Sequence, residues 1–254
     1  MINVTVSSKE LQTFISSILN VDRSGVSLKF FPDFVEALVL SEDNSSVILY
    51  TKLNILEISG METDELVIHV KDLTKMQKLL DMNNGETFTF SIRDNHIYFE
   101  NDMVKGAKFM LADRPSKTVN ARVNVQWFNS FEKTSRMKIS KPVVKSIIQC
   151  SSFTSDDANK VYVYQDGTKV VAEINDRTKN NLDNMSIYIG EIEEGQMEGK
   201  VILNVSTLSR LFLADEMTLE TSFIGQGVSR TEIVFLSFTN DNVSVRYLLN
   251  TLRS

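Results

Sequence analysis

Residues 66–80, LVIHVKDLTKMQKLL, place a strand pattern directly before a helix pattern, and this succession decides the fold because it recurs. Apolar and polar side chains alternate through LVIHV, which is typical of a strand with one buried face. The next residues carry apolar side chains at helical spacing and predict a helix over about Asp72–Met82. Residues 200–213, KVILNVSTLSRLFL, repeat the succession about 135 residues later, with Lys75 matched to Arg210.

A second pair of segments repeats in the same way. VSSKELQTFI (6–15) aligns with ISKPVVKSII (139–148) at an offset of about 133 residues, and each begins with strand residues and continues as a helix. Two repeats at nearly the same offset indicate a duplication of two halves, each containing two strand-helix units. The other predicted helices cover about Ser8–Asn20, Lys141–Ser151 and Ser206–Ala214.

Most of the remaining sequence alternates at period two and predicts antiparallel strands. KVYVYQDGTKVVAEI, ETFTFSIRDNHIYFE and TEIVFLSFTNDNVSVRYLL each place a turn signal between two strand patterns, so each predicts a hairpin. The predicted fold class is α+β. Residues 1–112 and 136–254 form the two halves, and residues 113–135, which contain Pro115, form a partly extended connector between them.

Composition limits the possible functions. The 254 residues carry a formal net charge of -6, with one cysteine and two histidines, so neither a disulfide framework nor a His/Cys metal cluster is expected. No Gly-rich phosphate loop and no usable nucleophile–base pair is present. We therefore expect no enzyme activity, no catalytic residue, no cofactor and no metal. Without a signal peptide or a long apolar run, the chain is expected to be cytoplasmic and not membrane-bound.

Positive charge gathers on the predicted helices although the chain is acidic. On a helical wheel Lys71, Lys75 and Lys78 fall within about 60° of one another, opposite Leu73 and Met76. The other helices add Lys9, Lys141, Lys145 and Arg210, while the acidic residues concentrate in predicted loops. Such segregation suits a surface held near phosphates. Lysines on amphipathic helices are also commonly just solvated, and this alternative stays open.

The order of these units resembles that of a DNA sliding clamp, the ring-shaped processivity factor of replicative polymerases. The resemblance covers nearly the whole chain and includes the runs SGVSLKFF, VKDLTKMQKLL and YQDGTKVV. The start of the connector, FMLADRPSKTV, is similar to that of clamps from T4-type bacteriophages. The resemblance implies two similar clamp domains, with antiparallel sheets outside and two helices of each domain inside, and a homotrimeric ring.

The resemblance also implies roles for particular residues. The residues expected to face double-stranded DNA, without reading its sequence, are Lys9, Lys71, Lys75, Lys78, Lys141, Lys145 and Arg210. The residues expected at the subunit interface, on the edge strands, are Lys105, Phe109, Leu111, Met185, Ile187 and Ile189. The residues expected to form a pocket for partner peptides are Phe31, Phe34, Trp127, Phe128, Leu248 and Leu252. The implied partners are a DNA polymerase, a clamp loader and further copies of the chain.

Two other functions remain open at this point. A monomeric processivity factor of the same fold would bind DNA directly, with salt-sensitive affinity. A β-rich virion structural protein would explain the strands but not the lysines on the helices. For a T4-type phage clamp the resemblance further implies the host cell cytoplasm as location, and a role in late transcription.

Overall fold

The computed structural model describes residues 1–41, 46–115, 125–154, 159–174, 184–225 and 231–251. The chain divides into two compact units, and each is described by itself. The first unit consists of Met1–Asn44, Ile48–Val125 and Thr239–Val245, and the second consists of Ser45–Val47, Gln126–Phe238 and Arg246–Ser254.

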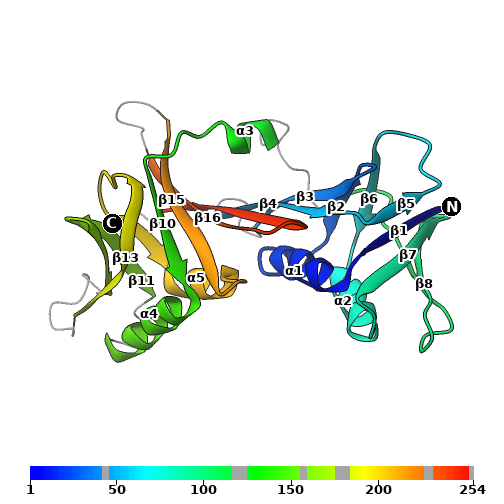
Figure 1. The fold of residues 1–254 in the computed structure, drawn as a ribbon, viewed down its shortest axis with the longest axis horizontal. Coiled ribbons are helices and arrows are strands. Elements are labelled where there is room, and N and C mark those ends of the chain that lie inside the picture. The colour runs from blue at the N-terminus through cyan, green and yellow to red at the C-terminus, as the bar shows by residue number, and fades with distance from the viewer. Residues whose placement is uncertain (42–45, 116–124, 155–158, 175–183, 226–230, 252–254) are drawn as a thin grey trace. The chain divides into compact units, whose positions relative to one another are not determined.

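The first unit contains two antiparallel sheets with two helices on one side of them (Figure 1). Its elements are β1 (Ile2–Ser7), α1 (Ser8–Leu19), β2 (Val26–Phe30), β3 (Phe34–Leu40), β4 (Val47–Asn54), β5 (Glu57–Ser59), β6 (Leu66–Val70), α2 (Leu73–Asp81), β7 (Thr87–Arg93), β8 (His96–Phe99) and β9 (Ala107–Met110). One sheet has the order β5-β1-β7-β8-β9, and the other strands are ordered β4-β3-β2-β6.

A single core joins these elements. Strand residues that alternate toward the helices, such as Leu28, Phe30 and Phe90, are buried together with Phe14 of α1 and Met76 of α2. The rings of Phe30 and Phe90, from different sheets, meet edge-on with centroids 6.3 Å apart. A void of only about 10 Å³ remains among these side chains, so the helices are packed tightly against both sheets.

The second unit repeats this plan. Its elements are α3 (Val125–Asn129, which begins at the end of the first unit), β10 (Ser135–Ser140), α4 (Lys141–Thr154), β11 (Lys160–Asp166), β12 (Lys169–Ile174), β13 (Met185–Gly195), β14 (Val201–Asn204), α5 (Val205–Leu211), β15 (Glu216–Ile224) and β16 (Thr231–Thr239); β17 (Val243–Asn250) has residues in both units. The strand order is β14-β11-β12-β13-β10-β15-β16. β10 lies between β13 and β15 as β1 lies between β5 and β7, which confirms the predicted fold class and its two similar halves.

The four predicted helices are present, with small differences at their ends. α4 continues to Thr154, beyond the predicted Ser151, and α5 stops at Leu211, before the predicted Ala214. At the N-cap of α1, the hydroxyl of Ser7 donates to the carboxylate of Glu10 and accepts no backbone N–H. Side-chain caps do form at Asp72 of α2 and Asn204 of α5, where each accepts a backbone N–H.

Two predicted hairpins are confirmed, and their turns explain the turn signals. β7 pairs with β8 through Asp94 and Asn95, which both adopt positive φ, as a two-residue hairpin turn requires. β11 pairs with β12 across Gly167 at φ 64°. In the third predicted hairpin the N–H of Asn240 donates to the carbonyl of Val243 at 3.0 Å, where β16 turns toward β17.

The connector contains a short helix that its weak periodicity did not predict. α3 places Phe128 in the core of the second unit, where its ring meets Phe235 edge-on at a centroid distance of 5.5 Å. Half of the remaining connector, residues 116–124, lies outside the described residues. Within the described ranges, no helix is long and apolar enough to cross a membrane.

Candidate nucleic-acid interface and partner surfaces

In the first unit, four cations lie exposed on or beside the two helices. α1 and α2 pack against each other and bury Leu11 and Leu73 on their apolar sides. Lys75 and Lys78, one turn apart on α2, are exposed, and so are Lys71 just before α2 and Lys9 in the first turn of α1. None of the four forms an ion pair with a carboxylate of the described residues, so their charges face solvent.

The second unit shows the same arrangement with fewer charges. α4 and α5 pack against each other, with Val144 and Leu208 buried on their apolar sides. Lys141 and Lys145, one turn apart on α4, are exposed, and Arg210 is exposed in the last turn of α5. They too form no ion pair among the residues that the structure describes. All seven predicted cations are thus exposed to solvent, and their contact with DNA stays a prediction.

The predicted edge strands have unpaired edges, as far as the described strands extend. β9 is the last strand of its sheet; Lys105 precedes it, Phe109 is half-buried within it and Leu111 is buried just after it. The first half of β13 pairs with β12 alone. Further along the strand, Ile192, Glu194 and Gly195 pair with β10. Met185 and Ile187 are half-buried, and Ile189 is buried. An open edge can accept another strand.

The predicted peptide-pocket residues of the first unit lie together. The half-exposed rings of Phe31 and Phe34 stack with centroids 4.5 Å apart at the end of the β2–β3 hairpin. The ammonium of Lys29 lies 5.0 Å from the Phe31 ring, and that of Lys52 lies 3.9 Å from the Phe34 ring. The pair is an exposed aromatic surface bordered by cations.

The predicted pocket residues of the second unit differ in exposure. Trp127 is half-buried, with its ring edge-on to Phe131 at 4.9 Å. Phe128 and Leu248 are only 0% and 2% exposed, so in this conformation both lie beneath the protein surface and not on it. Leu252 lies outside the described residues.

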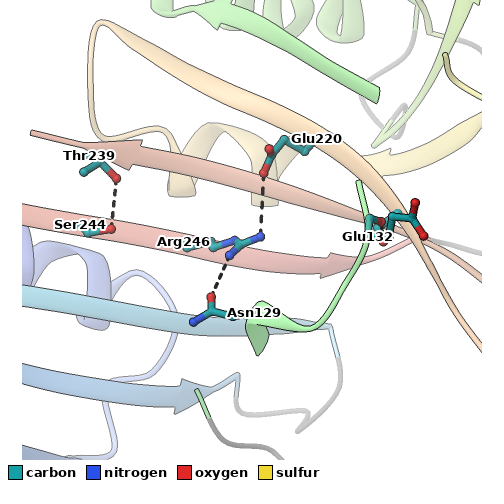
Figure 2. A network of polar contacts seen from close by, with 7 residues as sticks. Asn129, Glu132, Glu220, Thr239, Ser244 and Arg246 are labelled. Carbon is teal, nitrogen blue, oxygen red and sulfur yellow. Dashed lines mark hydrogen bonds and ion pairs between the residues drawn. The ribbon is translucent and has the colours of Figure 1, made fainter. Parts of the chain in front are cut away.

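A partly buried polar cluster beside α3 was not predicted from the sequence. Arg246 donates from Nη1 to Asn129 Oδ1 at 3.0 Å and lies 3.9 Å from Glu220 through Nη2 (Figure 2). The Arg246 guanidinium carbon lies 4.5 Å from the centroid of the Phe235 ring, and Lys133 Nζ lies 3.0 Å from the same centroid. Ser222 donates to the Glu132 carbonyl beside this cluster. Cation–π contacts with the Phe235 ring thus hold α3 and the residues after it against the rest of the second unit.

Both cations of this cluster have perturbed pKa values. Burial, reinforced by the neighbouring Arg246 charge and opposed by Glu220, lowers the pKa of Lys133 to about 7. Burial also lowers the pKa of Arg246 from its ordinary value, again opposed by Glu220. Lys133 Nζ is buried without a hydrogen-bond acceptor among the described residues. No periodicity signals such a cluster, because its members come from β15, β16, β17 and the connector.

Together, the duplicated units, the helices on one side of the sheets and the edge strands define the fold of a DNA sliding clamp. Solved structures of proliferating cellular nuclear antigen (PCNA) share it over the whole chain. The A. fulgidus protein, solved with the C-terminal region of FEN-1 bound, has a TM-score of 0.76 and 13% identity, covering 100% of this chain and 99% of that one. PCNA from Thermococcus kodakaraensis gives 0.73 at 14% identity (99% and 100% covered), and PCNA from Entamoeba histolytica gives 0.72 at 11% (99% and 99%).

The sequence itself matches no family model and no curated protein. At 11–14% identity the structural likeness establishes the fold.

Proposed function

We propose that the protein is a non-enzymatic sliding clamp, which encircles duplex DNA and tethers a replicative DNA polymerase to it. The observation that carries this proposal is the set of seven exposed cations on or beside the helices of a clamp fold, which form no ion pair with the carboxylates that the structure describes. Cations that contact only phosphates hold DNA without fixing a position along it, so the protein can slide. The surplus acidic residues, such as Glu191 and Glu193 on β13, are exposed away from the helices and would repel DNA elsewhere.

The ring is proposed to be a homotrimer closed by strand pairing. The open edge of β9 in one copy would pair with the first half of β13 in the next, around Lys105, Phe109 and Leu111 on one side. Met185, Ile187 and Ile189 would lie on the other side. Within each copy, residues 1–112 and 136–254 would be the two clamp domains and 113–135 their connector. A clamp loader is then required to open the closed ring around DNA.

Partner proteins are proposed to dock a short apolar peptide on the aromatic residues of the clamp. Phe31, Phe34 and Trp127 offer half-exposed rings, which suit an apolar anchor. Phe128 and Leu248 of the second unit would form the buried support on the Trp127 side. The C-terminal region of FEN-1 in the A. fulgidus PCNA structure is a precedent for such docking in that protein. The likeness of the connector to T4-type clamps extends the proposal to a phage clamp in the host cytoplasm that also serves late transcription.

The native mass tests the ring. We expect sedimentation or light scattering to give three times the chain mass of 28.8 kDa at micromolar concentration. A chain that stays monomeric at high concentration would contradict the ring and favour the monomeric processivity factor instead. In that case the isolated chain should bind linear duplex DNA with strongly salt-dependent affinity.

A further inference from the structure

A hollow of about 550 Å³ lies on the five-stranded sheet of the first unit. Its floor and rim come from β7, β8, β9 and the residues beside them. The lining residues that the argument uses are Met1, Ser91, Arg93, Tyr98 and Lys108. The volume is in the range of pockets that hold small ligands or a few peptide side chains.

Small side chains between larger ones create the hollow. Pairing of the strands places Ser91, Tyr98 and Lys108 in one row across β7, β8 and β9. Their neighbours in the strands, Phe90, Ile97 and Phe99, are buried toward the core, so the row lies on the opposite face of the sheet. The small Ser91 lies at one end of the row and Lys108 at the other. A methyl group added to Gly106 would contact nothing within 4 Å, which shows how open this end is.

The charges of the rim are not compensated. Arg93 and Lys108 are exposed, and neither forms an ion pair with a carboxylate of the described chain, while Glu100 is the one acidic residue in the lining. The guanidinium of Arg93 lies 4.3 Å from the Tyr98 ring. A stacked guanidinium is held in place and keeps N–H groups at its edge for a carboxylate.

The chemistry of the lining selects the kind of occupant. Two cations favour an anion, but the Tyr98 ring and the exposed Met1 side chain offer carbon surface that an inorganic anion would leave uncovered. The row faces away from the core that α1 and α2 cover, so DNA on the helices is separated from the hollow by the sheet. A polypeptide segment supplies both a carboxylate and an apolar side chain.

We propose that this hollow binds an acidic segment of a partner protein, with its carboxylates on Arg93 and Lys108 and an apolar side chain against Tyr98 and Met1. The site is separate from the aromatic surface at Phe31 and Phe34 and needs neither ring closure nor DNA. It can therefore be tested whether or not the chain acts as a clamp.

The probe is a library of short random peptides displayed on phage and selected on the full-length protein. The wild-type chain is expected to enrich peptides that combine Asp or Glu with an apolar residue. The affinity of a synthetic selected peptide, measured by fluorescence anisotropy, should fall about tenfold or more in the double variant Arg93→Ser, Lys108→Ser. The matched control Arg23→Ser, Arg114→Ser removes two exposed arginines outside the hollow and should bind as wild type does.

Lys108→Glu provides a second variant that leaves the Arg93–Tyr98 contact intact, and it should also weaken binding. All the altered side chains are exposed, and circular dichroism will verify that each variant is folded. No acidic enrichment, or equal peptide affinity in wild type and both hollow variants, would overturn the proposal. So would displacement of the peptide by inorganic phosphate at equal concentration, because the hollow would then be a site for the anion alone.

Discussion

Reversing two charges on α2, Lys75→Glu with Lys78→Glu, is expected to leave the protein folded and to weaken its hold on DNA by about tenfold or more. Both side chains are exposed and unpaired among the described residues, so the variant breaks no internal contact. The salt dependence should flatten as well, because each lost phosphate contact lowers the slope of log K against log salt by about 0.9. Anisotropy of a fluorescein-labelled duplex with both ends blocked, which a closed ring cannot leave by sliding, measures both effects over a range of salt concentrations.

The control for this variant must change the net charge equally. Arg23→Glu with Arg114→Glu reverses two exposed arginines that lie outside the helices, and it should bind the duplex nearly as wild type does. Native mass should be unchanged in both variants. If the α2 variant keeps wild-type affinity and salt slope, the lysines are ordinary solvated residues, and the proposed DNA contact through α2 is wrong. In a reconstituted replication assay, the α2 variant should shorten the DNA that the polymerase synthesises each time it binds the template.

The fold could be predicted because its signals are local. Period-two alternation marks the strands, helical spacing marks α1, α2, α4 and α5, and the 135-residue offset between Val70 and Val205 marks the duplication. The exposure of the α2 lysines could be predicted from their helical wheel, because the helix buries its one apolar side and leaves the opposite side to solvent. Burial and charge thus depend on residues only a few positions apart.

The missed features depend on distant residues. Trp127 and Phe128 were both predicted as pocket residues; α3 turns Phe128 against Phe235 and leaves Trp127 half-exposed, and the docking role of both stays a prediction. Which of two adjacent aromatic residues is buried depends on where the connector meets the sheet, and no local pattern specifies that. The contact of Arg246 with Asn129 spans 117 residues for the same reason. The hollow beside Tyr98 likewise arises from residues on three strands.

The cluster under α3 leads to the second large prediction, that Lys133→Met stabilises the protein at neutral pH. The pKa of Lys133 is about 7 in the folded chain and 10.5 in the unfolded one, so between these values the unfolded state binds more protons. Stability from this site therefore rises with pH from about 7 to 10.5, and the cost of burying the charge is largest below about 7. Methionine fills the same space without a charge. Because Lys133 is only half-buried, solvent screening reduces the expected gain to about 1–2 kcal/mol.

Urea unfolding of wild type and variant measures this gain as a difference in the free energy of unfolding. The difference should be largest at and below pH 7 and should shrink toward pH 10.5, above which the wild-type lysine becomes neutral in both states. Lys133→Arg is the matched control, because it keeps the charge at every pH and should gain nothing. A methionine variant that is less stable than wild type at pH 7, or a difference that does not change with pH, would show that the ammonium stabilises the fold. The contact of Lys133 Nζ with the Phe235 ring would then outweigh the cost of burial.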